Sequence, residues 1–165
     1  MNKLKYRKAW SWPQQVEDFI ASRARGYTVH VMCGESKLGD LRIDKYVENA
    51  DIHADALKGL PLNSEIADTV ICDPPWDMDY IYKPKLMSEL RRIIKFGGQL
   101  IFNAPWCPKC PGLQLEEIWC PTWQLMTFTH IALIFVCRKV KNKMFEVCPT
   151  GDIGGENENI NIQIE

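Results

Sequence analysis

The hydrophobic residues of this chain fall into short runs that are separated by glycine, proline and charged residues. Runs of about four to eight apolar or β-branched residues are typical of β-strands. Seven segments fit this description: 27–32, 40–44, 51–54, 67–72, 99–103, 115–119 and 131–137. The run at 67–72 is apolar enough to predict a strand buried on both faces, which is typical of a parallel sheet.

Two further segments have the apolar spacing of an amphipathic helix. Pro13 suits the first turn of a helix over 13–24, which Gly26 would end. A second helix is predicted over 84–95, and Gly97-Gly98 would end it. The residues expected to face the core are Val16, Phe19, Ile20 and Ala24 in the first helix, and Leu86, Leu90, Ile93 and Ile94 in the second.

Strands that alternate with helices or loops predict an α/β fold. We expect a Rossmann-like, doubly wound arrangement, in which a mostly parallel, twisted sheet carries helices on both faces. Only eight residues, Cys33 to Asp40, separate the first two predicted strands. Since parallel neighbours are usually joined by a longer crossover, the first crossover helix is expected to be reduced.

The 165 residues, of which 46% are hydrophobic, are enough for one domain with a core. The formal net charge of −1 excludes a polybasic protein that holds nucleic acid by bulk charge. No apolar run approaches the ~20 residues that span a bilayer, and none follows the basic N-terminus as in a signal peptide. We therefore expect a cytoplasmic protein without membrane contact, with one domain over 1–148 and a flexible polar tail over 149–165.

The seven cysteines are an odd number and several lie in apolar runs, which favours reduced thiols over a disulfide framework. Cys107-Pro108-Lys109-Cys110 has the spacing of a zinc knuckle, and Cys120 could add a third thiolate. Structural zinc usually takes four ligands from two such pairs, and no second Cys-x-x-Cys occurs. A proline-rich loop after the fifth strand is the alternative interpretation.

Asp73-Pro74-Pro75-Trp76 directly follows the buried strand 67–72. Ligands of open parallel sheets bind beyond the carboxyl ends of the strands, where this tetrapeptide would lie. The two prolines make a stiff, extended turn that has few N–H donors to occupy its carbonyl groups. A planar group with an NH2 substituent could donate to the Asp73 carboxylate and the Pro74 carbonyl while its ring stacks on Trp76. A rigid turn with a buried tryptophan is the alternative.

An Asp-Pro-Pro sequence followed by an aromatic residue resembles the motif of S-adenosylmethionine-dependent methyltransferases that act on amino groups, above all on adenine N6 in DNA. The resemblance covers roughly residues 10–140. It implies the class I methyltransferase fold, with Asp73, Pro74, Pro75 and Trp76 as the catalytic segment. Methyl transfer would be a direct in-line displacement without a metal or a covalent enzyme intermediate. In a duplex, the target base would have to be flipped out.

The same resemblance implies a cofactor loop after the first strand, where glycine lets the backbone approach a ligand closely. The residues assigned to the cofactor are Met32, Cys33, Gly34, Glu35, Ser36, Asp44, Asp55, Ala56 and Asp73. Asp44 would hold the ribose hydroxyls, and Asp55 or the Ala56 amide would meet the adenine edge. Either acid also fits an ordinary turn or helix start. Trp10-Ser11-Trp12 would close over the methionine carboxylate or pack a helix onto the sheet.

Two other groups of residues have both a functional and a structural interpretation. His30 and His53 lie on predicted strands and could touch a cofactor, although a hydrogen-bonded core histidine is the more common case. Basic clusters at 3–8, 91–95 and 138–143 could contact phosphates or form solvated surface.

The sequence therefore predicts a small S-adenosylmethionine-dependent N-methyltransferase of nucleic acid, with adenine N6 in DNA as the first acceptor and RNA adenine as the second. A tRNA base or a protein glutamine is the alternative within the fold, and a non-catalytic, zinc-stabilised nucleic-acid-binding module is the alternative outside it. A nicotinamide dehydrogenase is disfavoured because the loop after the first strand lacks Gly-x-Gly-x-x-Gly. A chain of 165 residues leaves little room for a recognition domain, so a homodimer or a separate subunit is expected to supply that surface.

Overall fold

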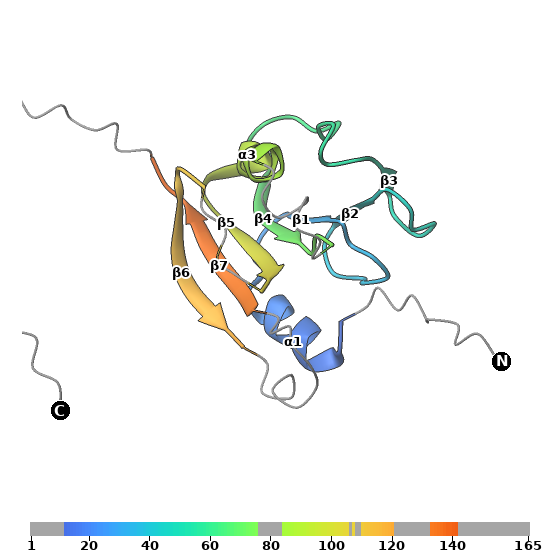
Figure 1. Ribbon diagram of the computed structural model, residues 1–165, viewed down its shortest axis with the longest axis horizontal. Coiled ribbons are helices and arrows are strands. Elements are labelled where there is room, and N and C mark those ends of the chain that lie inside the picture. The colour runs from blue at the N-terminus through green and yellow to red at the C-terminus, as the bar shows by residue number, and fades with distance from the viewer. Residues whose placement is uncertain (1–11, 76–83, 106, 108–109, 121–132, 142–165) are drawn as a thin grey trace, which may run out of the picture.

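The computed structural model describes residues 12–75, 84–105, 107, 110–120 and 133–141. Its strands form one seven-stranded sheet in the order β3-β2-β1-β4-β5-β7-β6 (Figure 1). The strands are β1 Thr28–Val31, β2 Leu41–Asp44, β3 Ile52–His53, β4 Ala67–Cys72, β5 Ile94–Ala104, β6 Leu113–Trp119 and β7 Leu133–Lys139. The helices of this part of the chain are α1 Gln14–Arg23 and α3 Pro84–Ile93.

Strands β3, β2, β1, β4 and β5 are parallel, whereas β7 runs antiparallel between β5 and β6. The predicted doubly wound sheet, mostly parallel, is confirmed. The antiparallel insertion distinguishes it from the dinucleotide-binding order 3-2-1-4-5-6. Because β1, β4 and β5 are parallel neighbours, their carboxyl ends meet at one edge of the sheet.

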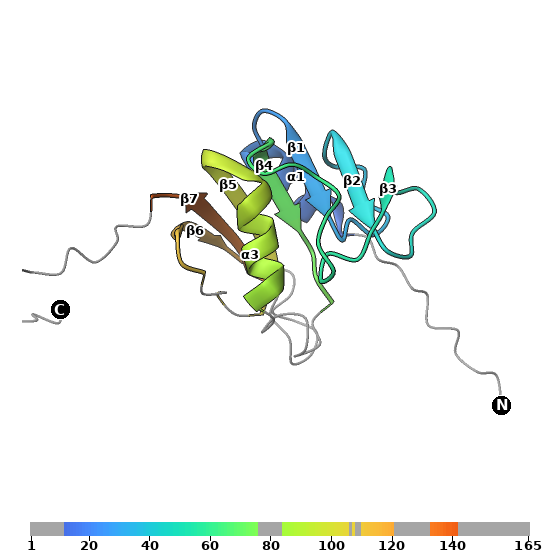
Figure 2. The same ribbon diagram turned by 90° about the horizontal axis from the view of Figure 1, so that it is seen from above.

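The two helices cover opposite faces of the sheet, as Figure 2 shows. Helix α3 packs on the larger core with Val70, Leu100 and Phe135, and α1 packs on Ile71, Ile101 and Ile134. Successive strand residues therefore point to alternate helices, which follows from the two-residue period of a strand. β4 and the centre of β5 are apolar on both faces for this reason.

The predicted elements agree with the structure to within a few residues, with one correction at the start of β5. The helix predicted to run to Lys95 and end at Gly97-Gly98 ends at Ile93, and β5 begins at Ile94. Ile94 pairs with Ala67 and Gln99 pairs with Thr69, so the register shifts between them. The glycines form a bulge inside the strand instead of a helix terminus.

The first crossover helix is absent from the described residues between β1 and β2, as the short spacing predicted. Side chains hold this loop in place of a helix. Asp40 accepts the Thr28 N–H at 2.8 Å, and Ser36 donates its hydroxyl to Glu17 of α1 at 2.8 Å. The Cys33 N–H donates to the Ile43 carbonyl at 3.2 Å. The loop is thereby fixed to α1, β1 and β2.

Among the described residues, no helix is long and apolar enough to cross a membrane. The tail predicted over 149–165 lies outside the described residues.

The bulge at the start of β5 can be tested by adding one carbon. A Cβ on Gly98 would lie 2.8 Å from the Asp68 carbonyl oxygen and 3.0 Å from the Lys95 carbonyl oxygen. We expect Gly98→Ala to lower the free energy of unfolding by about 1–3 kcal/mol. Gly97→Asn is the control, because asparagine tolerates the φ of +77° and a Cβ there meets nothing within 4 Å. Urea denaturation measures both variants, and an equally small loss of unfolding free energy in the two would contradict the bulge geometry.

Candidate active site

The predicted site residues gather where the parallel strands end. Asp73 directly follows β4, and Asn103 lies opposite it near the end of β5, since Cys72 pairs with Phe102. The loop beginning at Met32 follows β1, and Asp44 ends β2. This is the edge at which open parallel sheets bind their ligands.

Asp73 is the most perturbed carboxyl group at this edge. Asn103 Nδ2 donates to Asp73 Oδ1 at 2.8 Å. The residue is partly exposed, but its carboxyl lies deep enough that burial raises the pKa to about 7, against the opposing effects of the Asn103 amide and the Trp12 indole N–H. The indole effect is weak, because Trp12 Nε1 meets no acceptor in hydrogen-bond geometry. Asp73 is therefore poised to change charge near neutral pH.

The two prolines after Asp73 differ in exposure. Pro74 is buried and Pro75 is exposed. Trp76, predicted to stack on the acceptor ring, lies outside the described residues.

The loop after β1 begins with an unusual backbone conformation. Met32 has a φ of +57° and Gly34 a φ of +53°, both in the left-handed region. That region is unfavourable for a side chain such as methionine, and strain of this kind concentrates at ligand sites. Cys33 is buried, which raises the pKa of its thiol to about 11, so the thiol stays protonated. Glu35 is exposed, while the buried Ser36 is held by α1.

Asp44 connects the loops that follow β1 and β2. Its Oδ2 accepts the Gly34 N–H at 3.1 Å, and its Oδ1 accepts the Tyr46 and Val47 N–H groups at 2.8 and 3.2 Å. A carboxylate has about four acceptor positions, so three backbone donors leave capacity at Oδ2 for one more. The side chain is fixed by its own backbone before any ligand arrives.

Asp55 follows β3 but is already engaged. Its Oδ1 accepts the Leu57 N–H at 3.0 Å, and its Oδ2 lies 3.2 Å from Lys45 Nζ. Burial by itself raises the pKa of Asp55, but the Leu57 N–H and the Lys45 ammonium more than offset this, and the pKa falls below its ordinary value. The neighbouring Ala56 is buried in the larger core.

Trp12 and His30 pack against each other, and Trp12 Nε1 and His30 Nε2 are both buried without a hydrogen-bond partner among the described residues. Their rings stack with centroids 5.2 Å apart, and His30 Nδ1 lies 3.2 Å from the Leu38 carbonyl oxygen. Burial lowers the pKa of His30 to about 4, so the ring is neutral at pH 7. Trp10 and Ser11 lie outside the described residues, and His53 is exposed on β3.

The sequence analysis missed Asn103. It appeared there only as the last residue of the predicted strand 99–103. The available signal was a lone amide at the end of the apolar run 99–103, which is the next predicted strand along the chain after the one that precedes Asp73. A polar residue in such a position is buried only with a partner, which here is the Asp73 carboxyl.

No cluster of three or more His, Cys, Asp or Glu side chains able to hold a metal occurs in the described ranges. Within those ranges the cysteines form no disulfide. Cys137 lies near Cys107 and Cys110, and burial, together with these thiols, raises its pKa to about 12. His130 and Cys148, two further residues of a type that can bind zinc, lie outside the described residues.

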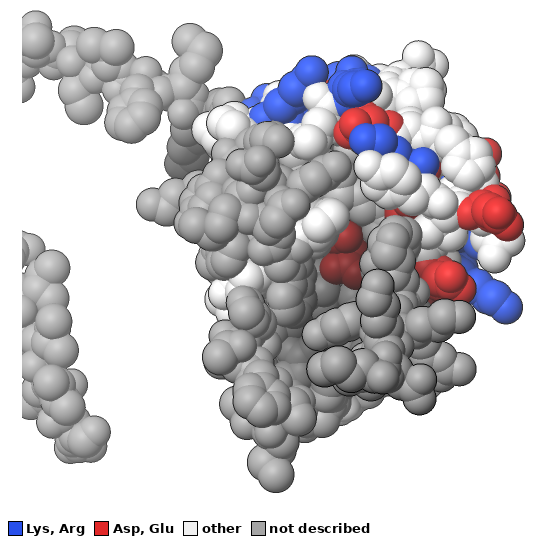
Figure 3. Space-filling model, turned by 45° about the vertical axis from the view of Figure 1, so that its right-hand side comes forward, with Lys and Arg blue, Asp and Glu red and all other residues white. Residues whose placement is uncertain are grey.

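The described parts of the predicted basic clusters are largely paired with acids. Arg92 bonds to Glu89 at 2.6 Å, and Lys95 bonds to Asp68 at 2.9 Å. Arg138 pairs with Glu116, and Lys139 pairs with Glu65 at 3.0 Å. On the face in Figure 3, basic and acidic groups lie side by side. These pairs favour the solvated-surface interpretation for these four residues.

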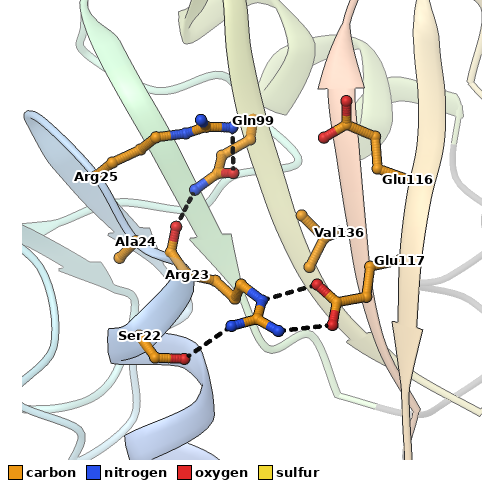
Figure 4. A pocket seen from close by; sticks show the side chains of 8 residues that line it. All are labelled: Ser22, Arg23, Ala24, Arg25, Gln99, Glu116, Glu117 and Val136. Atoms are coloured by element: carbon orange, nitrogen blue, oxygen red, sulfur yellow. Dashed lines mark hydrogen bonds and ion pairs between the residues drawn. The ribbon is translucent and has the colours of Figure 1, made fainter.

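A separate hollow of about 480 Å³ lies between the end of α1 and strands β5 to β7 (Figure 4). Arg23 forms a two-point ion pair with Glu117 at 2.7 and 2.8 Å, and Gln99 accepts from Arg25 and donates to the Arg23 carbonyl. None of the predicted site residues lines it. Its polar groups bond to one another and tie α1 to the sheet.

Comparisons with known proteins identify the fold. No family model matches the chain, and no curated protein matches it. Among solved structures, the 16S rRNA (adenine(1408)-N(1))-methyltransferase of Catenulisporales acidiphilia, in a variant form with cosubstrate SAM, superposes with a TM-score of 0.53 at 12% identity, covering 78% of this chain and 92% of that chain. The fold is that of the class I methyltransferases.

Two further solved structures agree. A SAM-dependent methyltransferase from Aquifex aeolicus has a TM-score of 0.52 at 12% identity, covering 75% of this chain and 89% of that chain. A TehB-like SAM-dependent methyltransferase from Corynebacterium glutamicum has a TM-score of 0.53 at 16% identity, covering 74% of this chain and 85% of that chain. At these identities the likeness concerns the fold.

The raised pKa of Asp73 predicts a pH-dependent cost to stability. The folded state retains the proton between the ordinary pKa of about 4 and the folded value of about 7, so this contribution is lost as pH rises through that window. Relative to wild type, Asp73→Asn should gain about 1 kcal/mol or more in unfolding free energy between pH 4 and pH 8. Thermal denaturation across this range measures the difference.

Asp51→Asn is the matched control. Arg42 lowers the pKa of the exposed Asp51 carboxyl, so its contribution is present above about pH 4 and is lost as pH falls. A difference between wild type and Asp73→Asn that does not change with pH would show that Asp73 is not desolvated as described.

Proposed function

We propose that this protein is an S-adenosylmethionine-dependent methyltransferase that modifies an exocyclic amino group, with adenine N6 in DNA as its first acceptor. One observation carries the proposal. The Asp73-Pro74-Pro75 segment extends from the carboxyl end of a central strand in a class I methyltransferase fold, with the Asp73 carboxyl desolvated and held by Asn103.

The groups at the strand ends support the cofactor assignment. The backbone at Gly34 has no side chain to obstruct a ligand, and Asp44, beside it, keeps an acceptor position for a ribose hydroxyl. Asp55 fits less well through its side chain, because Lys45 and the Leu57 N–H already occupy it. We therefore assign the adenine edge to the backbone at Ala56 rather than to the Asp55 carboxylate.

When bound, the cofactor supplies a methyl group on a sulfonium centre, which is already a strong electrophile. The protein's task is to align the amine and exclude water. We propose that one amine N–H donates to Asp73 Oδ2 and the other donates to the Pro74 carbonyl. These two hydrogen bonds direct the nitrogen lone pair toward the methyl group of the cofactor. Trp76 is assigned the stacking contact with the acceptor ring. The nitrogen must lose a proton after it gains the methyl group, and we assign the Asp73 carboxylate as the group that accepts it.

RNA adenine is the second candidate acceptor. One structural neighbour is, by its description, a methyltransferase of adenine in 16S rRNA. The proposed acceptor is thus a nucleic acid, and a second copy of the chain or a separate subunit is proposed to supply additional recognition surface.

Removal of the Asp73 carboxyl tests the catalytic assignment. Asp73→Ala should reduce methyl transfer by at least about a hundredfold, because the amine loses its charged acceptor. Cofactor affinity should change little, because this proposal assigns the Asp73 carboxyl to the amine and not to the cofactor. Transfer from methyl-labelled cofactor to DNA, RNA and protein measures the first effect, and equilibrium binding measures the second. Asp51→Ala is the control on the exposed surface. Normal turnover by Asp73→Ala would exclude the proposed site.

The loop after β1 gives a second test. Gly34→Ala places a Cβ where the chain has a φ of +53° and where the cofactor is proposed to approach. We expect cofactor affinity to fall about tenfold or more, or by at least about 1.4 kcal/mol, because the added Cβ occupies space that the cofactor needs. The substitution also strains the backbone by about 1–2 kcal/mol. Gly97→Ala matches the strain with its φ of +77° at the opposite end of the sheet, and it should leave affinity unchanged. Equal affinities for both variants would remove this loop from the cofactor site.

A further inference from the structure

Asn103 is a buried amide in an otherwise apolar stretch of β5. It has 4% exposure and lies between Phe102 and Ala104, which are fully buried. A buried amide is costly unless its polar atoms are bonded. Its Nδ2 donates to Asp73 Oδ1 at 2.8 Å, but its Oδ1 is buried and meets no hydrogen-bond partner among the described residues.

That half-satisfied state is difficult to explain by stability alone. A leucine or alanine at position 103 would bury no unpaired oxygen, and the same face of the sheet is filled with isoleucine at Ile71, Ile101 and Ile134. Local choices that cost stability without a packing gain are expected at functional positions. The gain at this position is the contact with Asp73.

The direction of the hydrogen bond determines what Asn103 can do. An amide NH2 can only donate, so it matches a carboxylate oxygen and occupies Oδ1. The register of β4 and β5 places the two side chains directly opposite each other, which fixes the contact through the sheet rather than through a loop.

We propose that Asn103 is a positioning residue of the methyl transfer: it binds one oxygen of the Asp73 carboxylate so that the other is presented to the acceptor amine. This inference rests on the proposed function. Asn103 itself touches neither cofactor nor substrate.

The surroundings of Asp73 make Asn103 its strongest described partner. The other group acting on the carboxyl is the Trp12 indole, which is uncharged. Cys72 on the same strand carries a thiol whose pKa burial and Asp73 raise well above its ordinary value, and His30 on β1 is neutral at pH 7. Since these described neighbours are uncharged at pH 7, the donated hydrogen bond is what favours the ionised carboxylate against burial.

The test compares wild type with Asn103→Leu, which has nearly the same size but no donor. The acidic limb of the kcat/KM profile should move upward by about one pH unit, and kcat at pH 7 should fall with little change in cofactor affinity. An NMR titration that follows the carboxyl 13C shift of Asp73 should show the same upward movement of the Asp73 pKa, and this measurement needs no turnover.

Gln99→Leu is the matched control. Gln99 is another buried amide on β5, with 2% exposure, and it bonds to the Arg23 carbonyl and Thr69 rather than to Asp73. The Gln99→Leu variant should have a lower free energy of unfolding but an unchanged pH profile of kcat/KM. If Asn103→Leu fails to fold, Asn103→Asp is the second variant, because aspartate has nearly the same shape as asparagine. The second carboxyl next to Asp73 should raise the pKa of Asp73 still further.

Three results would overturn the proposal. The first is an unchanged pH profile with an unchanged Asp73 titration, which would leave Asn103 a structural role alone. The second is a shift in Gln99→Leu equal to that in Asn103→Leu. The third is an absence of methyl transfer by wild type while the NMR shift is intact: this would refute the proposed function, and with it the catalytic purpose of the contact, but not the Asn103–Asp73 bond.

Discussion

The burial of β1, β4 and β5 between two helices is the constraint on which the site depends. Helices α1 and α3 cover opposite faces, so these central strands are buried on both sides, and β1, β4 and β5 pair in parallel with one another. Their carboxyl ends then meet at one edge, and residues far apart in sequence, such as Asp73 and Asn103, come into contact there. A polar group at that edge is held by sheet register, which gives little freedom of position.

Two carboxylates at this edge are in opposite environments. Asp44 accepts three backbone N–H groups and is fixed as part of the scaffold. Asp73 has one amide donor, and its burial raises the pKa to about 7. Environments of this kind separate carboxyl groups into different roles. In our proposal, Asp44 supports the cofactor, whereas Asp73 orients the acceptor amine.

Much of the fold could be predicted from the sequence because strand and helix periodicities are local. The run from Ala67 to Cys72 predicted a buried strand, and the short spacing before β2 predicted a reduced crossover helix. The bulge at Gly97-Gly98 could not be predicted, because two glycines after a helical pattern are typical of a helix end. Only pairing with β4 shows that they lie within a strand.

The site was predicted less completely. The motif placed Asp73 at a strand end, which the structure bears out, but the contact with Asn103 depends on the register of two distant strands. The engagement of Asp55 by Lys45 likewise depends on a contact between loops.

The position of the transferred methyl group tests the central claim most directly. The protein would be incubated with methyl-labelled S-adenosylmethionine and with DNA, RNA and protein, and the products digested and identified by mass spectrometry. We expect the label in N6-methyladenine, first from DNA. Label on a carbon or oxygen atom would contradict an amine-directed site at Asp73, and the absence of both label and cofactor binding would contradict the methyltransferase assignment.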